Sequence, residues 1–272
     1  MTPAAENAAL FDRRAWRAHR ERAARTETVD FLHDEVSERL LDRLDLIEGR
    51  FSSILDLGAR HGMLGRAAAE RVRAEMIVAA EPASAFLAGC STPRVAADPE
   101  LLPFAAASFD LVVSVLALHW TSDLPGALVQ LRRVLRPDGV LLAAMLGGDT
   151  LVELRTALFE AELAEEGGVS PRVSPGVALS DAAALLQRTG FSMPVADSET
   201  VTVTYSDALA LMRDLRRMGE SNALARRRRQ PTRRGTIARA VSLYAEMFGQ
   251  PDGRIPATFE ILFLTGRASA AP

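Results

Sequence analysis

The stretch Ile54-Leu55-Asp56-Leu57-Gly58-Ala59-Arg60-His61-Gly62 decides the fold of this chain. Apolar residues run up to Gly58, and Gly62 follows at the start of an Ala-rich helical segment, 64–72. The pattern predicts a buried strand, a tight turn and the N-terminus of a helix. Such a turn presents backbone N–H groups at the positive end of a helix, and its glycines let a ligand approach the main chain. The stretch therefore predicts a site for a nucleotide-like cofactor.

Strands and helices alternate through the first half of the chain. We predict strands over 53–57, 76–80, 94–97, 109–118 and 140–146, and helices over 30–47, 64–72 and 124–135. Nearly continuous apolar strands are typical of a sheet covered on both faces. Their alternation with helices through short connections predicts an α/β fold with a doubly wound, mostly parallel sheet.

The pattern changes after the pair Gly147-Gly148. We predict helices over 150–166, 180–189, 206–225 and 236–248, an edge strand over 195–205 and a last strand over 258–264. A helical insertion of roughly 50 residues thus separates the last two strands, which is far longer than a hairpin connection. We predict three parts: an N-terminal helical segment (1–50), an α/β domain (51–205 and 257–267) and a helical lid insertion (206–256).

Three acidic residues follow the ends of predicted strands. Asp56 precedes the glycine turn and could orient the loop or receive an amino group. Glu81, about 20 residues past the turn, could accept hydrogen bonds from both hydroxyls of a ribose, and Asp98 could accept from the exocyclic amine of adenine. Ligands of open α/β sheets bind outside the carboxyl ends of the strands. The order of the acids favours an adenosyl cofactor; a nicotinamide dinucleotide is the alternative, and each acid alone could be a helix cap.

Composition limits the other classes of function. With 48% hydrophobic and 25% charged residues and a formal charge of -3, the chain is predicted to be globular and no general binder of polyanions. Its single cysteine, Cys90, excludes internal disulfides and Cys-cluster metal sites. The four histidines, His19, His33, His61 and His119, are scattered and form no His-x-Asp pattern with a distal histidine, so we expect no metal site. The absence of a signal peptide and of a long apolar run predicts a cytoplasmic protein with no integral membrane segment.

Two sets of motifs resemble known families. The runs Asp110-Leu111-Val112-Val113-Ser114, Leu116-Ala117-Leu118-His119-Trp120 and Leu135-Arg136-Pro137-Asp138-Gly139 resemble class I S-adenosylmethionine-dependent methyltransferases. The second half is similar to the NADH dehydrogenase (complex I) assembly factor 5 family, with which the biotin-pathway malonyl-carrier-protein methyltransferases form a sister group. The motifs of that second resemblance lie at 147–155, 166–171, 218–222 and 256–259, and Phe11-Asp12-Arg13 fits them.

The resemblance implies S-adenosylmethionine as the cofactor and a seven-stranded, Rossmann-like methyltransferase sheet. The cofactor-binding residues would be Asp56, Gly58, Arg60, Gly62, Glu81 and Asp98. Arg60 replaces the middle glycine of the usual Asp-x-Gly-x-Gly-x-Gly loop. Its side chain could point to solvent, pair with the carboxylate of the cofactor, or block the site.

The same resemblance implies a protein substrate, a complex I subunit, that is methylated or hydroxylated on arginine during assembly. The alternatives are a malonyl-carrier-protein O-methyltransferase of biotin synthesis and a non-catalytic assembly factor with a degenerate cofactor site. The sequence leaves open the acceptor atom, the oligomeric state and whether turnover occurs.

Candidate residues of the acceptor pocket lie beyond the fourth and fifth predicted strands. His119 and Trp120 could contact the substrate or only pack the strand end, and Asp149 and Glu153 could do the same or compensate a helix dipole. Glu220 and its neighbours could form a helix cap or a contact of the lid. The arginines at 226–229, 233 and 234 form a basic patch that could dock an acidic protein; because interleaved aromatics are missing, we predict no nucleic-acid partner.

Overall fold

The computed structural model describes residues 9–26 and 29–269. Its sheet has the strand order β3-β2-β1-β4-β5-β7-β6. The strands are β1 (Ser53–Leu57), β2 (Met76–Ala80), β3 (Arg94–Val95), β4 (Phe109–Val115), β5 (Leu135–Leu146), β6 (Phe191–Tyr205) and β7 (Ile255–Ala268). β1 to β5 pair in parallel, whereas β7 is antiparallel to β5 and to β6. The predicted seven-stranded, mostly parallel sheet is confirmed.

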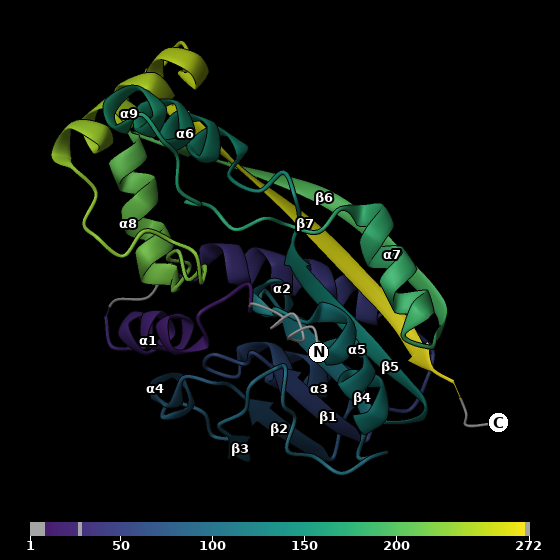
Figure 1. Cartoon of the computed structure of the whole chain (residues 1–272). Helices are drawn as coiled ribbons and strands as arrows, with labels where there is room; N and C mark the ends of the chain where they lie inside the picture. The colour runs from purple at the N-terminus through teal and green to yellow at the C-terminus, as the bar shows by residue number, and fades with distance from the viewer. Residues whose placement is uncertain (1–8, 27–28, 270–272) are drawn as a thin grey trace, which may run out of the picture.

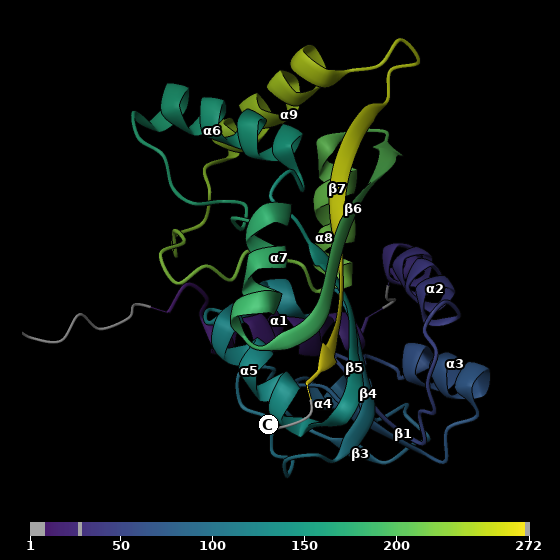
Figure 2. The same cartoon turned by 90° about the vertical axis from the view of Figure 1, so that its right-hand side faces the viewer.

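Helices cover both faces of the sheet, so each face has its own apolar core. Figure 2 shows α2 and α3 on one side and α5 and α7 on the other. The helices are α1 (Arg13–Ala24), α2 (Phe31–Leu44), α3 (Met63–Val72), α4 (Ser84–Leu87), the 3₁₀ turn η1 (Leu118–Trp120), α5 (Leu124–Val134), α6 (Val152–Glu166), α7 (Leu179–Arg188), α8 (Ala208–Met218) and α9 (Arg234–Phe248). The doubly wound arrangement predicted from the alternation of elements is therefore present.

The direction of winding reverses between β1 and β4. From β1 the chain adds β2 and β3 on one side and then returns to place β4 on the other. Connections that diverge in this way open a crevice at the carboxyl ends of the two central strands, where ligands bind in open α/β sheets. The glycine turn after β1 and the η1 turn after β4 both lie at this crevice.

The strand β6 forms one edge of the sheet and is interrupted near its start. A register shift lies between Ser192 and Val195, and Pro194, which has no backbone N–H, stands inside it. Further along, Asp197 and Glu199 form ion pairs with Arg43 of α2. These features limit how far a second chain can extend the sheet at this edge.

The N-terminal helix α1 lies across the crevice end of the molecule and packs against α4 and α8 (Figure 1). It begins after Asp12, whose side chain accepts a hydrogen bond from the backbone N–H of Ala15. Its buried face is formed by Trp16, Arg20 and Ala23, at spacings of one helical turn. An arginine thus lies in the stripe that a helix normally fills with apolar residues. The division into segments 1–50, 51–205 with 257–267, and 206–256 stays a prediction.

Candidate functional site

The glycine turn after β1 has the backbone geometry that its sequence predicts. Gly58 and Gly62 have φ values of 73° and 72°, in the left-handed region that favours glycine. A Cβ atom on Gly58 would lie 2.3 Å from Cβ of Ala117, because the turn packs closely on the chain that leaves β4. The backbone therefore requires glycine at position 58 and favours it at position 62, whether or not a ligand approaches them.

Asp56 is buried beneath this turn. Its Oδ2 accepts a hydrogen bond from the backbone N–H of Gly65 in α3, at 2.9 Å, while its Oδ1 has no hydrogen-bond partner. Burial raises the pKa of Asp56 to about 7, although the Gly65 hydrogen bond acts in the opposite direction. The carboxyl group is thus about half protonated at pH 7, and its local role is to orient the loop against α3.

Glu81, the predicted ribose acceptor, is bound by an arginine of the N-terminal helix. Arg20 donates from Nε to Oε1 at 2.8 Å and from Nη2 to Oε2 at 2.6 Å, and both side chains are almost fully buried. The backbone N–H groups of Ala83 and Arg60 donate to the same two oxygens, at 3.1 and 3.2 Å. Because a carboxylate oxygen has two lone pairs, these four donors satisfy Glu81.

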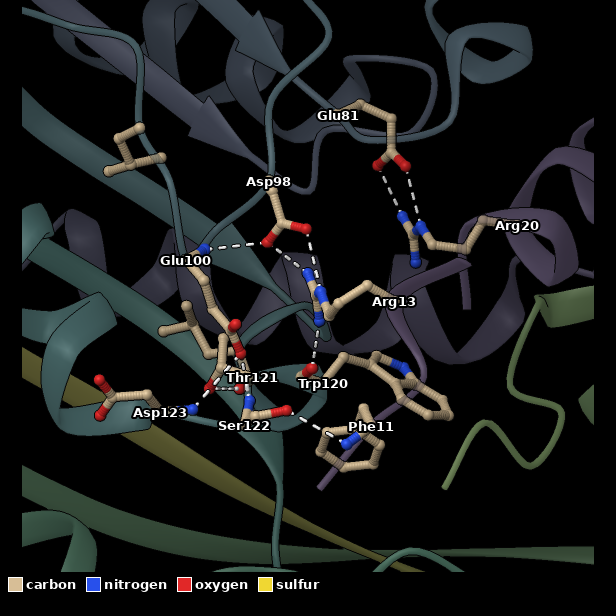
Figure 3. Close-up of polar contacts among 12 residues, drawn as sticks. Phe11, Arg13, Arg20, Glu81, Asp98, Glu100, Trp120, Thr121, Ser122 and Asp123 are labelled. Carbon is tan, nitrogen blue, oxygen red and sulfur yellow. Dashed lines mark hydrogen bonds and ion pairs between the residues drawn. The ribbon is translucent and has the colours of Figure 1, made fainter. Parts of the chain in front are cut away.

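Asp98, the predicted adenine acceptor, is bound in the same manner by Arg13 (Figure 3). The Arg13 Nε atom lies 2.9 Å from Oδ2, its Nη2 donates to Oδ1, and the backbone N–H of Glu100 also donates to Oδ1. The remaining Arg13 nitrogen, Nη1, donates to the carbonyl oxygen of Trp120 at 2.5 Å. Helix α1 therefore reaches both acids and the turn after β4.

Arg60 points neither to solvent nor at Glu81 with its side chain. It is buried with φ of 48°, and its Nη1 donates to the carbonyl oxygen of Met218, at the end of α8, at 2.8 Å. Its Nη2 pairs with Asp30, the residue before α2, and its guanidinium lies over the ring of Phe86. The arginine that replaces a glycine of the family loop thus joins the loop to the end of α8.

A cavity of about 290 Å³ lies beside the crevice, between η1, the start of α6 and the end of α8. Its wall is mostly apolar and includes Leu116, Leu154, Met212 and Phe259. The polar part of the wall includes His119, Trp120, Glu220, Ser221 and Asn222. The structure thus brings His119 and Trp120 together with the segment at the end of α8, which the sequence separates from them by about a hundred residues.

Glu220 is an acidic residue of this wall, and Arg172, which also lines the cavity, pairs with Glu162 at 2.6 Å. Its Oε2 lies 3.1 Å from Nε2 of His119 and accepts from Nε1 of Trp120 at 2.9 Å, whereas its buried Oε1 has no hydrogen-bond partner. Burial alone would raise the pKa of Glu220, but His119 and the guanidinium groups of Arg20 and Arg60 outweigh burial and hold it below its ordinary value. The cavity therefore has an ionised carboxylate with a free acceptor.

His33 lies between this cavity and a smaller one of about 50 Å³ at the glycine turn, since it lines both. Both of its ring nitrogens are buried without a hydrogen-bond partner. Burial, and then the positive charges of Arg60 and Arg20, hold the pKa of His33 well below its ordinary value. The ring is thus neutral and separates the two cavities.

The other two candidates of the acceptor pocket have different neighbours. Asp149 is exposed, and its backbone N–H donates to Glu260 at 2.9 Å. Glu153 is buried and accepts from the backbone N–H of Thr258 at 3.2 Å and from the hydroxyl group of the same residue. Both connect α6 and the loop before it to β7, and their predicted contact with a substrate stays a prediction.

Part of the basic patch is bound within the chain. Arg227 pairs with Asp12 at 3.0 Å, which fixes the start of α1 to the segment after α8. Arg228 pairs with Glu166 of α6. These arginines connect the segment after α8 to α1 and α6, and docking of an acidic partner on the patch stays a prediction.

Sequence reasoning missed the two arginines that bind the predicted cofactor acids. The spacing of Trp16, Arg20 and Ala23 is a signal that Arg20 is buried, because all three lie on one face of a helix. Nothing in that spacing indicates its partner, Glu81, which lies 61 residues away in sequence. No sequence pattern indicated that His33 would line the two cavities.

Comparison with known proteins identifies the class first. Residues 55–143 match the family model described as a methyltransferase domain. The YcgJ protein of Bacillus subtilis shares the fold, with a TM-score of 0.59 at 16% identity over 86% of this chain and 100% of that one. The [4+2]-cyclase SpnF shares it with a TM-score of 0.52, over 88% of this chain and 81% of that one. The chain is thus a class I methyltransferase-fold protein.

The sequence relatives define the family within this class. The chain is 40% identical to the mitochondrial arginine-hydroxylase NDUFAF5 of Danio rerio, over 94% of this chain and 82% of that protein, and 41% identical to the human protein, over 94% and 76%. A malonyl-[acyl-carrier protein] O-methyltransferase of Methylovorus sp. is 35% identical, over 94% of this chain and 89% of that one. The chain belongs to the NDUFAF5 family, as its motifs predicted, and S-adenosylmethionine is the cofactor that this membership implies.

The arrangement around Glu81 and Asp98 does not fit an adenosyl group in this conformation. The acceptors that would receive ribose and adenine are bound by Arg20 and Arg13, and the cavity at the glycine turn holds only about 50 Å³. Within residues 9–26 and 29–269, no three His, Cys, Asp or Glu side chains gather as a metal site requires. In the same ranges, no helix has the length and apolar character needed to cross a membrane.

Proposed function

We propose that this protein modifies an arginine side chain of a complex I subunit, and that the cavity between η1, α6 and α8 receives that side chain. The observation that supports this most directly is Glu220, whose buried Oε1 has no partner at the cavity wall. A buried carboxylate with a free oxygen favours a ligand that brings N–H donors and positive charge. The guanidinium group supplies both, and its methylene stem suits apolar walls.

The name of the relatives supports the same acceptor. The NDUFAF5 proteins of Danio rerio and Homo sapiens are named arginine-hydroxylases. Methyl transfer and hydroxylation would both begin with an arginine bound at Glu220. The proposal covers both, and the mass added to the substrate, a methylene group or an oxygen atom, distinguishes them.

The test is mass spectrometry of complex I subunits from three strains: wild type, a deletion and Glu220→Gln. We expect one arginine to be modified in the wild type and unmodified in the other two. The matched control is Glu160→Gln, which removes an exposed carboxylate from α6 and should leave the modification intact. An arginine modified equally in wild type and Glu220→Gln would contradict the role of Glu220.

The second candidate is methylation of a malonyl-carrier-protein thioester, which the identity to the O-methyltransferase relatives supports. A malonyl carboxylate in this cavity would face the ionised Glu220, and like charges in a desolvated site repel. The guanidinium of Arg172, which also lines the cavity, is already paired with Glu162. We therefore favour arginine. If this gene allowed a biotin auxotroph to grow without biotin, methylation of the malonyl thioester would be favoured over modification of arginine.

The third candidate is an assembly factor without turnover. It requires that complex I assembles normally with Glu220→Gln and fails only in the deletion strain. Native gel analysis of complex I in the same three strains separates this role from catalysis. The cytoplasmic location stays a prediction, and the NDUFAF5 relatives are named mitochondrial.

A further inference from the structure

The N-terminal helix α1 occupies the positions where the cofactor family would place the nucleoside. Figure 3 shows Arg20 and Arg13 extending from α1 to Glu81 and Asp98. Each guanidinium makes two parallel hydrogen bonds to its carboxylate, which is the strongest arrangement open to these groups. Four donors already satisfy Glu81. Ribose hydroxyls can reach this carboxylate only after Arg20 leaves.

Outside these two ion pairs, α1 contacts the domain through polar contacts and two apolar clusters. Asp12 pairs with Arg227, Glu21 accepts a hydrogen bond from the Ser84 hydroxyl group, and Nδ1 of His19 lies 3.1 Å from the carbonyl oxygen of Ser221. One apolar cluster combines Trp16 with Phe11, Trp120 and the segment after α8, and another combines Ala23 with Ala83 and Phe86. Neither cluster is part of the two cores that cover the sheet. The helix can therefore move away without opening a core that holds the sheet together.

The closed position of α1 also leaves polar groups unsatisfied. Nη1 of Arg20 and Nε1 of Trp16 are both buried without a hydrogen-bond partner. A buried donor without an acceptor loses its hydration and gains nothing in return. This loss opposes the stabilisation that the ion pairs of α1 contribute.

We propose that α1 is a latch that closes the nucleoside part of the cofactor site, and that S-adenosylmethionine binds only after Arg20 and Arg13 release Glu81 and Asp98. The two acids then have two alternative sets of donors: the guanidinium groups of α1, or the ribose hydroxyls and the adenine amine. Because only the open fraction of the protein can bind, the latch lowers the apparent affinity by that fraction. This inference concerns the cofactor site and does not require that an arginine side chain binds at Glu220.

The first experiment measures S-adenosylmethionine binding to the full chain by calorimetry. We expect Arg13→Ala/Arg20→Ala to bind at least about tenfold more tightly than wild type, because the open state then dominates. The matched control is Arg17→Ala, which removes the same charge from the exposed face of α1 and should bind like wild type. A folded double variant that binds no more tightly than wild type would overturn the proposal and make the pairs permanent parts of the fold.

The single variant Arg13→Ala is a second test, in case the loss of buried Arg20 prevents folding. The Arg13 and Asp98 side chains are 25% and 21% exposed, so this change leaves no fully buried charge. We expect it to tighten binding by several-fold. Unchanged affinity in this variant, with the double variant unfolded, would also count against the latch.

Hydrogen exchange distinguishes displacement of α1 from a simple change of charge. In wild type, saturating S-adenosylhomocysteine should speed the exchange of the α1 amides and protect those of the glycine turn. Arg17→Ala should show the same pattern. If the ligand binds while the α1 amides keep their protection, the helix is not a latch.

Discussion

Two carboxylates, at the cofactor end and at the acceptor end of one crevice, differ in how many hydrogen-bond donors already bind them. At the cofactor end, four N–H donors satisfy Glu81. At the acceptor end, Glu220 has two partners on one oxygen and none on the other. The more deeply buried of the two, Glu81, is the one without a free oxygen, so burial alone does not identify a ligand site. The number of donors already present decides whether a carboxylate can receive a ligand.

The largest expected effect concerns Asp56, which tests whether the cofactor end is sealed from water. Burial raises its pKa from 3.8 to about 7, which corresponds to roughly 4 kcal/mol. Between these values the native state holds a proton that the unfolded chain has lost. The free energy of unfolding should therefore fall as pH rises from about 4 to about 7, and this contribution is complete below pH 4.

Asp56→Asn should lack this fall while keeping an acceptor for Gly65. Urea denaturation at pH 5 and pH 8 measures it as the difference between variant and wild type. The control is Asp42→Asn, an exposed carboxylate of α2. If the difference between Asp56→Asn and wild type is the same at both pH values, water reaches Asp56 and the cofactor end is open.

The next effect concerns the acceptor end. Glu220→Gln keeps an acceptor for Trp120 but removes the charge opposite a bound guanidinium. Loss of one partner of a buried charge pair costs about 2–5 kcal/mol, so affinity should fall on the order of a hundredfold or more. The measurement is titration with a peptide that contains the arginine left unmodified in the deletion strain. Affinity equal to that of wild type would place the arginine elsewhere.

A smaller effect is expected at Arg60, which connects the two ends. Arg60→Gly restores the family glycine and relieves a left-handed residue, but it removes hydrogen bonds to Met218 and Asp30. Because charged hydrogen bonds contribute about 1.5–3 kcal/mol each and the relief returns about 1–2 kcal/mol, the net loss of stability should be about 2 kcal/mol. Chemical denaturation measures it. A variant as stable as wild type would mean that Arg60 does not stabilise the contact between the glycine turn and the end of α8.

The smallest effect is expected for Arg73→Gly, which is the matched control for Arg60→Gly. Arg73 has φ of 55° at the end of α3, but its side chain is exposed. Arg73→Gly relieves the same kind of backbone strain without removing a buried contact, so it should stabilise the chain by about 1 kcal/mol. A loss of stability in Arg73→Gly would show that replacing a residue of positive φ by glycine does not stabilise this chain, contrary to what is assumed for Arg60→Gly.

The sequence predicted most helices and strands but not the tertiary contacts that α1 makes over the ends of the strands. The strands over 53–57 and 76–80 match β1 and β2 because a strong apolar period ends at glycine or an acid. The strand predicted over 109–118 ends earlier, at Val115, since Leu116 has φ of 49° and the chain turns into η1. Such local errors arise because apolar residues also fill turns that are buried by tertiary contacts.

The candidate site was harder to predict for a different reason. Glycine turns and acids at strand ends follow from local order along the chain. The partners of those acids come from α1, and the position of α1 depends on how Trp16 packs against Trp120, over a hundred residues away. The same holds for Glu220 and His119. For long-range contacts of this kind, the sequence shows which residue is present but does not indicate its partner.

The choice of arginine in α1 determines what can open the crevice. Burial opposes the charge of Arg20, but Glu81 outweighs it and raises the pKa of Arg20 above its ordinary value. Arginine keeps its proton in proteins, so the cationic half of the pair does not discharge as pH rises. A histidine in its place would make cofactor access depend on acidity. With arginine, access depends on the concentration of a competitor for Glu81, so the helix responds to the supply of cofactor.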